Sequence, residues 1–105
     1  MGGKTSLNQL KAFFKSISSS LELKRVILFG SRADGTPGKD SDFDFIVVSG
    51  KFTGVKFHER PAKLYRAWNI DAPADFLCFT PAEFDNKAQR ISIVSHAIKH
   101  GVTIM

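Results

Sequence analysis

The sequence predicts an α/β domain in which a mixed sheet of three to four strands is flanked by helices. Three short apolar runs of strand length, 25–29, 43–48 and 74–79, alternate with stretches whose apolar residues recur at helical spacing. Both alternating faces of the second run are apolar beyond its start, which is typical of a strand covered by helices on both sides. A chain of 105 residues supports one core, so we expect a single domain over residues 1–105.

The N-terminal half predicts one helix and two strands. Ser6 and Gln9 match a capping box, and apolar residues follow at helical spacing as far as Leu21. The serine run at 18–20 is expected to mark the fraying end of this helix. The first two apolar runs then form strands, joined by a loop rich in Gly and Pro.

The C-terminal half predicts further helices around a third strand. Residues 55–68 are expected to be helical, with the regular part beginning at a proline. The third strand covers 74–79, and the capped sequence Thr-Pro-Ala-Glu at 80–83 begins another helix. Apolar residues from Ile91 to Ile98 predict a last helix that ends at Gly101, followed by a short final strand.

Composition narrows the setting of the protein. Fifteen Lys and Arg against ten Asp and Glu give a net charge of +5, which favours polyanions such as a nucleoside triphosphate or a nucleic acid. No apolar stretch approaches the roughly 20 residues of a membrane span. The single cysteine, Cys78, cannot form an internal disulfide, so we expect a cytoplasmic protein in which Cys78 belongs to the core.

The most informative pattern is Gly30-Ser31, ten further residues, and then Asp42-Phe43-Asp44. Residues two apart on a strand share a face and lie roughly 7 Å apart, at about 3.3 Å of rise per residue. Two carboxylates placed in this way can share Mg²⁺, which prefers oxygen ligands. Gly30 permits close backbone approach to a phosphate, and Ser31 supplies a hydroxyl. The pattern predicts a site for nucleotidyl transfer.

These residues also carry a family resemblance. The stretches LFGSRADG and SDFDFIVV resemble the signature of minimal nucleotidyltransferase domains of the DNA polymerase beta-like superfamily, and the resemblance covers almost the whole chain. It implies the nucleotidyltransferase fold. It also implies that an aspartate pair and a third carboxylate bind two Mg²⁺ ions, while the Gly-Ser turn, here Gly30 and Ser31, holds the nucleotide phosphates. The implied reaction transfers NMP, with ATP as the expected donor, to an acceptor hydroxyl and releases pyrophosphate.

Three aspartates are the candidate catalytic and metal-binding residues. The resemblance gives Asp42 and Asp44 the role of bridging both metals. Asp75 is the candidate third carboxylate, because it opens a strand and matches the family's acidic residue before an apolar run. Its competitors are Asp71, in an expected loop, and Asp85, within a capped helix.

Several basic residues are weaker candidates for binding the nucleotide. Arg32 follows Ser31 directly, and its permanent charge suits it to neutralise departing pyrophosphate. Lys39, Lys87 and Arg90 are cations without an assigned role.

The resemblance also implies a partner. Larger members of the superfamily carry an extra helical domain, and minimal nucleotidyltransferases are commonly paired with an all-helical HEPN protein in toxin–antitoxin modules. The resemblance therefore implies that such a HEPN protein or a second copy of the chain completes the site. An alternative from another class is a non-catalytic module that neutralises its partner by contact. An RNA-binding domain is the third hypothesis and ranks last, because it depends on net charge alone.

Overall fold

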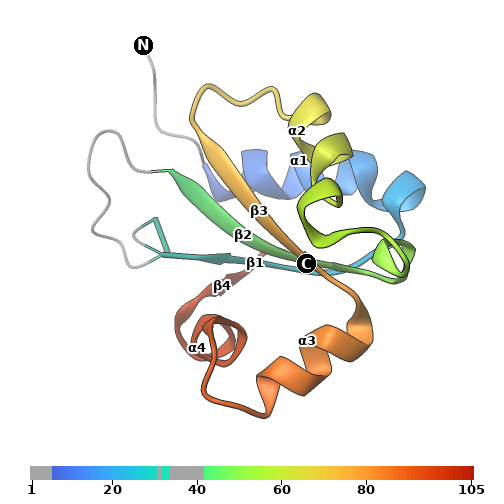
Figure 1. The fold of residues 1–105 in the computed structure, drawn as a ribbon. Helices are drawn as coiled ribbons and strands as arrows, with labels where there is room; N and C mark the ends of the chain where they lie inside the picture. Colours follow the sequence, from blue (N-terminus) through green and yellow to red (C-terminus); the bar gives the residue numbers. More distant parts are fainter. Residues whose placement is uncertain (1–5, 31, 34–41) are drawn as a thin grey trace.

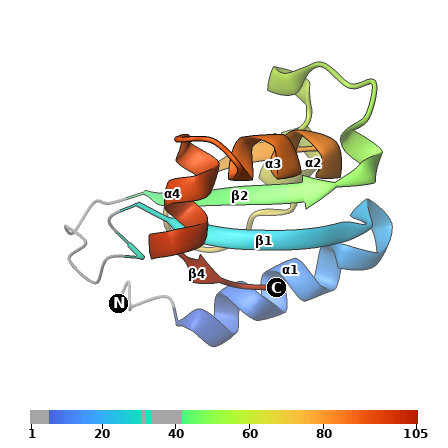
Figure 2. The same ribbon diagram turned by 90° about the horizontal axis from the view of Figure 1, so that it is seen from below.

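The computed structural model describes residues 6–30, 32–33 and 42–105, and it has the predicted α/β architecture (Figure 1). Helices α1 and α2 cover one face of a four-stranded sheet, and α3 and α4 cover the other (Figures 1 and 2). The elements follow in the order α1 (Leu7–Leu21), β1 (Leu23–Phe29), β2 (Phe43–Ser49), η1 (Gly50–Phe52), η2 (Phe57–Glu59), α2 (Ala62–Ala67), β3 (Ala74–Phe79), α3 (Pro81–Ala88), α4 (Ile93–His100) and β4 (Val102–Thr103), where η denotes a 3₁₀ helix.

The sheet is mixed, with the strand order β3-β2-β1-β4. Strand β1 is antiparallel to both β2 and β4, whereas β2 and β3 run parallel. Parallel neighbouring strands begin at the same end of a sheet, so the first residues of β2 and β3 lie side by side. The last residues of β1 lie at that same end, because β1 runs antiparallel to β2.

Strand β2 is buried between two apolar layers. On the α1 and α2 side, Phe45 is fully buried, packs edge-on against Phe14 with ring centroids 4.8 Å apart and stacks on Phe76 at 5.6 Å. On the α3 and α4 side, Ile46 and Val48 are buried. The fully apolar character of this strand therefore follows from burial on both faces, as predicted.

Helix α1 runs through the serine run that was expected to fray. The hydroxyls of Ser18 and Ser20 donate to the carbonyl oxygens of Lys15 and Ile17, at 3.0 and 3.2 Å, so they are accommodated within the helix. The helix stops where Glu22 adopts a left-handed backbone with φ of 48°. The N-terminal capping box is present as predicted.

Two helix predictions in the C-terminal half need correction. Residues 55–60 are not a regular helix and include the 3₁₀ helix η2, whereas the regular helix α2 begins directly after Pro61, as predicted. Helix α4 begins at Ile93, after its cap Ser92, so Ile91 precedes the helix and is fully exposed. Gly101 ends α4 as predicted.

The single cysteine lies in the core, as predicted. Cys78 on β3 is 1% exposed, and burial raises the pKa of its thiol to about 12. A thiol with so high a pKa stays protonated at neutral pH and reacts poorly.

None of the helices in the described residues is both long and apolar enough to cross a bilayer.

One ion pair joins the segment before α2 to helix α3. The guanidinium of Arg60 donates to both carboxylate oxygens of Glu83, at 2.6 and 3.2 Å, and to the carbonyl oxygens of Val55 and Cys78. The Arg60 side chain is 9% exposed. Glu83 also closes the capping box of α3 with Thr80, and its hydrogen bond from Arg60 holds the pKa of Glu83 below its ordinary value.

We predict that Arg60→Met lowers the free energy of unfolding by about 2 kcal/mol, because it leaves the partly buried carbonyl of Cys78 and the carboxylate of Glu83 without their charged donor. Urea denaturation at neutral pH measures the change. Lys51→Met is the matched control: Lys51 pairs with Glu22 at 3.5 Å on the open surface, and its loss should change the free energy by under about 0.5 kcal/mol. Equal effects of the two variants would contradict the prediction.

Candidate active site

Carboxylates gather where β2 and β3 begin. Asp44 on β2 lies directly opposite Asp75 on β3 in the parallel register, and Asp42 immediately precedes β2. Asp42 and Asp75 are exposed, whereas Asp44 is half-buried. The sheet thus brings together all three aspartates that the sequence analysis selected.

Electrostatics confirms that these carboxylates are close. Burial raises the pKa of Asp44, and the negative charges of Asp75 and Asp42 raise it further. A divalent cation would relieve this repulsion, and carboxylate oxygens are the donors that Mg²⁺ prefers. Within the described residues, no three His, Cys, Asp or Glu side chains are arranged as a ready-made metal cluster. The aspartates therefore offer the donor chemistry that a divalent metal prefers, but they are not arranged here as a metal cluster.

The two competing aspartates lie elsewhere. Asp85 is on α3, which begins after the last residue of β3, at the end of that strand opposite to Asp75. Asp71 is exposed in the connection between α2 and β3. The charges that raise the pKa of Asp44 come from Asp75 and Asp42. This favours Asp75 over both competitors as the third carboxylate.

Gly30 directly follows the last residue of β1 and lies beside these aspartates. Its backbone is left-handed, with φ of 81°, and a Cβ atom on Gly30 would lie 2.7 Å from Oδ2 of Asp44. Its carbonyl oxygen accepts a hydrogen bond from the amide of Ala33 at 3.0 Å, which forms a turn. Glycine is therefore required here both for the conformation and for the space. Ser31 and Lys39 lie outside the described residues.

The basic candidates are distributed differently. The Arg32 guanidinium lies over the Phe43 ring, 4.3 Å from its centroid, so it is at the carboxylate end of the sheet. Phe43 packs in the core on the α1 and α2 side, whereas Asp44 is one residue further along the strand and faces the other side. Lys87 is on α3 with its ammonium 5.7 Å from the Phe79 ring, and Arg90 is exposed after α3.

Tyr65 is a neighbour of the site that the sequence analysis did not select. Its hydroxyl donates to Oδ1 of Asp75 at 3.2 Å, and its ring packs edge-on against Phe76. Partial burial and the Asp75 carboxylate raise the pKa of the Tyr65 phenol, so the phenol is a hydrogen-bond donor at neutral pH. Nothing in the sequence pairs residue 65 with residue 75, because β3 is an edge strand and α2 reaches around it only in the folded structure.

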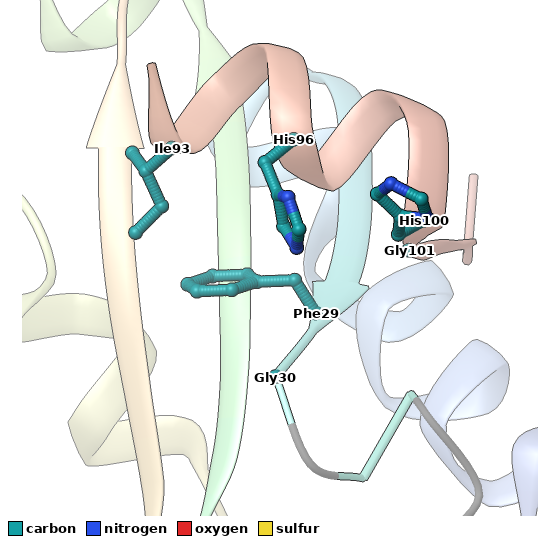
Figure 3. Close-up of a pocket in the computed structure, with 6 residues that line it drawn as sticks. All are labelled: Phe29, Gly30, Ile93, His96, His100 and Gly101. Atoms are coloured by element: carbon teal, nitrogen blue, oxygen red, sulfur yellow. The ribbon is translucent and has the colours of Figure 1, made fainter. Parts of the chain in front are cut away.

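A pocket of about 240 Å³ lies beside Gly30 (Figure 3). The pocket is lined by the last residue of β1, by helix α4 and by the residue that directly follows each of these two elements. The lining residues are Phe29, Gly30, Ile93, His96, His100 and Gly101. The histidines had no predicted role, since their sequence spacing matches no zinc site.

We predict that Gly30→Ala destabilises the protein by about 1 kcal/mol through its left-handed backbone and also displaces the Asp44 carboxylate. Gly54→Ala is a matched control, because Gly54 has φ of 80° and no atom within 4 Å of an added Cβ. Both variants should lose similar stability in urea denaturation. Only Gly30→Ala should change the Asp44 pKa, measured by carboxyl NMR; an unchanged pKa would disprove the contact.

We also predict that Asp44→Asn raises the melting temperature at neutral pH. A carboxyl whose pKa is raised on folding binds its proton more tightly in the folded state, so its contribution to stability falls as pH rises from the ordinary value of 3.8 through the raised one. The difference in melting temperature between the variant and the wild type should therefore grow over that pH range. Asp71→Asn, outside the group, should give no such growth, and a lower melting temperature for Asp44→Asn at neutral pH would contradict the prediction.

Comparison with known proteins identifies the family. Residues 7–100 match the family described as the nucleotidyltransferase domain. No curated protein matches the chain.

Two solved structures have a similar fold. A candidate nucleotidyltransferase from Sulfolobus solfataricus is 22% identical, with a TM-score of 0.64 over 96% of this chain and 88% of that one. A toxin–antitoxin structure with AMP-PNP is 20% identical, with a TM-score of 0.57 over 90% of this chain and 72% of that one. The fold similarity agrees with the family match, and the chain belongs to the nucleotidyltransferase domain family of transferases.

Proposed function

We propose that the protein transfers AMP from ATP to an acceptor hydroxyl in a Mg²⁺-dependent reaction that releases pyrophosphate. The observation that supports this most directly is the register of β2 and β3, in which Asp44 lies opposite Asp75 next to Gly30. The same end of the sheet therefore carries carboxylates suited to bind a metal and a glycine turn suited to bind phosphates. Membership of the nucleotidyltransferase domain family supports the reaction class.

The proposed roles follow from where each residue lies. Asp42 and Asp44 would hold both Mg²⁺ ions, and Asp75 would hold one of them. Bound there, Mg²⁺ stabilises the attacking and leaving oxygens of an in-line displacement. Asp75 also accepts the proton of the attacking hydroxyl, and the hydrogen bond from Tyr65 orients its carboxylate.

The phosphates are assigned to the turn after β1. Gly30 lets the backbone approach them, and Ser31 would donate a hydroxyl to a β- or γ-phosphate oxygen. Arg32 is proposed to neutralise the departing pyrophosphate. Because Arg32 packs on Phe43 on the opposite face of β2, this role requires its side chain to leave that ring when nucleotide binds.

We further propose that a partner completes the site, as a helical HEPN protein in a toxin–antitoxin pair or as a second copy of this chain. A structural neighbour is a toxin–antitoxin structure with AMP-PNP, which supports both a nucleotide and a protein partner. In this assignment the chain is the antitoxin and acts in the cytoplasm.

The decisive experiment compares the wild type with the double variant Asp42→Asn/Asp44→Asn. We expect the wild type to bind ATP with Mg²⁺ in calorimetry and to transfer label from the α-phosphate to its partner. The double variant should lose both, by at least about a hundredfold, because the metal ligands are gone. Asp71→Asn/Asp85→Asn is the matched control, since it removes the same charge away from the strand edge and should retain both.

The alternative of a non-catalytic binding module predicts a different result. A double variant that still neutralises its partner as well as the wild type would favour contact alone. Wild-type protein that binds no Mg²⁺–ATP, either alone or with its copurified partner, would disprove the proposed reaction.

A further inference from the structure

The pocket between β1 and α4 lies on the same face of the sheet as the catalytic carboxylates. Phe29 is the cross-strand partner of Asp44, and directly opposed residues share a face with Cβ atoms about 5 Å apart. Gly30 contributes to both places, because it lines the pocket and also lies next to the Asp44 carboxylate. Figure 2 shows α4 over the end of the sheet where β1 ends and β2 begins. The pocket is therefore directly adjacent to the proposed phosphate and metal site.

The walls of this pocket suit a flat, uncharged ring. The rings of Phe29, His96 and His100 and the aliphatic side chain of Ile93 surround the space (Figure 3). The two imidazoles are neighbours, with centroids 4.6 Å apart. Planar rings stack well on aromatic side chains, and an imidazole nitrogen can exchange a hydrogen bond with the edge of a ring.

The same walls are poorly suited to phosphate. Among the described residues that line the pocket, none is Lys or Arg. The described lining therefore offers an anion no Lys or Arg side chain, whereas the uncharged base of a nucleotide needs none.

The fold itself sets the width of the pocket through Gly101. A Cβ atom on Gly101 would lie 2.5 Å from the carbonyl oxygen of Ala97 and 2.7 Å from that of Leu28. Any larger residue would push the end of α4 away from β1. The close approach of helix and strand places His96 above Phe29 and His100 beside Gly101, as Figure 3 shows.

We propose that this pocket binds the nucleobase of the substrate, with His96 and Phe29 in contact with the base. This inference rests on the proposed function, since it takes the α-phosphate to lie at Asp42 and Asp44. Only the ribose separates a base from its α-phosphate, and Phe29 and Gly30 are the immediate neighbours of Asp44. The proposal assigns base recognition to Phe29 of β1 and His96 of α4, two residues that are not part of the Gly-Ser and Asp-x-Asp motif.

The test observes the histidines directly. The chain has three, so the Hε1 ring protons of His96, His100 and His58 give three NMR resonances, assigned by single His→Gln variants. Adenosine without Mg²⁺ should shift the resonances of His96 and His100, because it offers a base without phosphates. His58, exposed in η2, should not respond.

A second measurement uses affinity. His96→Ala should weaken ATP binding about tenfold, as expected for the loss of one stacking partner, and leave the binding of Mg²⁺–tripolyphosphate unchanged. His58→Ala should change neither. This comparison separates the pocket from the metal and phosphate site, because tripolyphosphate has no base.

The outcomes distinguish the two proposals. If Mg²⁺–tripolyphosphate binds but adenosine shifts no histidine, or His96→Ala leaves ATP affinity intact, the base pocket is wrong and the proposed function stands. If adenosine shifts His96 and His100 but tripolyphosphate does not bind, the pocket stands and the metal site fails. If N-acetyltyrosinamide shifts His96 and His100 and adenosine does not, the pocket binds an acceptor side chain and the proposal is overturned.

Discussion

The parallel pairing of β2 with β3 is the constraint on which the rest of the structure depends. It places Asp44 opposite Asp75, and the antiparallel pairing of β1 brings Gly30 to the same point. A shift of one residue in either register would turn a carboxylate to the other face of the sheet. The burial of β2 on both faces disfavours such a shift, because the shift would move the large rings that pack against α1 to the other face of the sheet and would place a carboxylate in the aromatic layer.

The carboxylate group opposes stability, and the surrounding structure must compensate. Asp44 is held half-buried among like charges, which raises its pKa. The compensation comes from the aromatic layer on the far side of β2, where Phe14, Phe45 and Phe76 interlock with centroids 4.8 to 6.3 Å apart. The strand that carries Asp44 is therefore held in place by a packed aromatic layer on its opposite face. This arrangement is common to sites whose function requires closely spaced charges.

The sequence predicted the features that depend on local chemistry or on periodicity. The strand runs, the capping boxes of α1 and α3 and the buried Cys78 were all recognisable, since caps and apolar periodicity act over a few residues. Gly30 was selected from its motif, and its left-handed backbone beside Asp44 supplies the physical reason.

The features that the sequence did not predict arise from contacts between distant segments. Tyr65 contacts Asp75 only because α2 packs beside the edge strand β3. Arg60 contacts Glu83 because the segment before α2 lies next to the start of α3 in the folded chain. The histidines of α4 had no sequence pattern that relates them to Phe29. The start of α4 was misplaced because apolar periodicity included Ile91, which the structure leaves in solvent. The catalytic roles of the aspartates remain predictions, now with a common location.

The buried thiol of β3 has a practical consequence. Cys78 is the one cysteine of the chain, it lies on the strand that carries Asp75, and its thiol is protected both by burial and by its high pKa. A thiol reagent can therefore modify the protein only in molecules whose third strand has opened. Cys78 is therefore a natural reporter of that opening. The rate of its modification with and without nucleotide would measure how far nucleotide reduces the opening of β3.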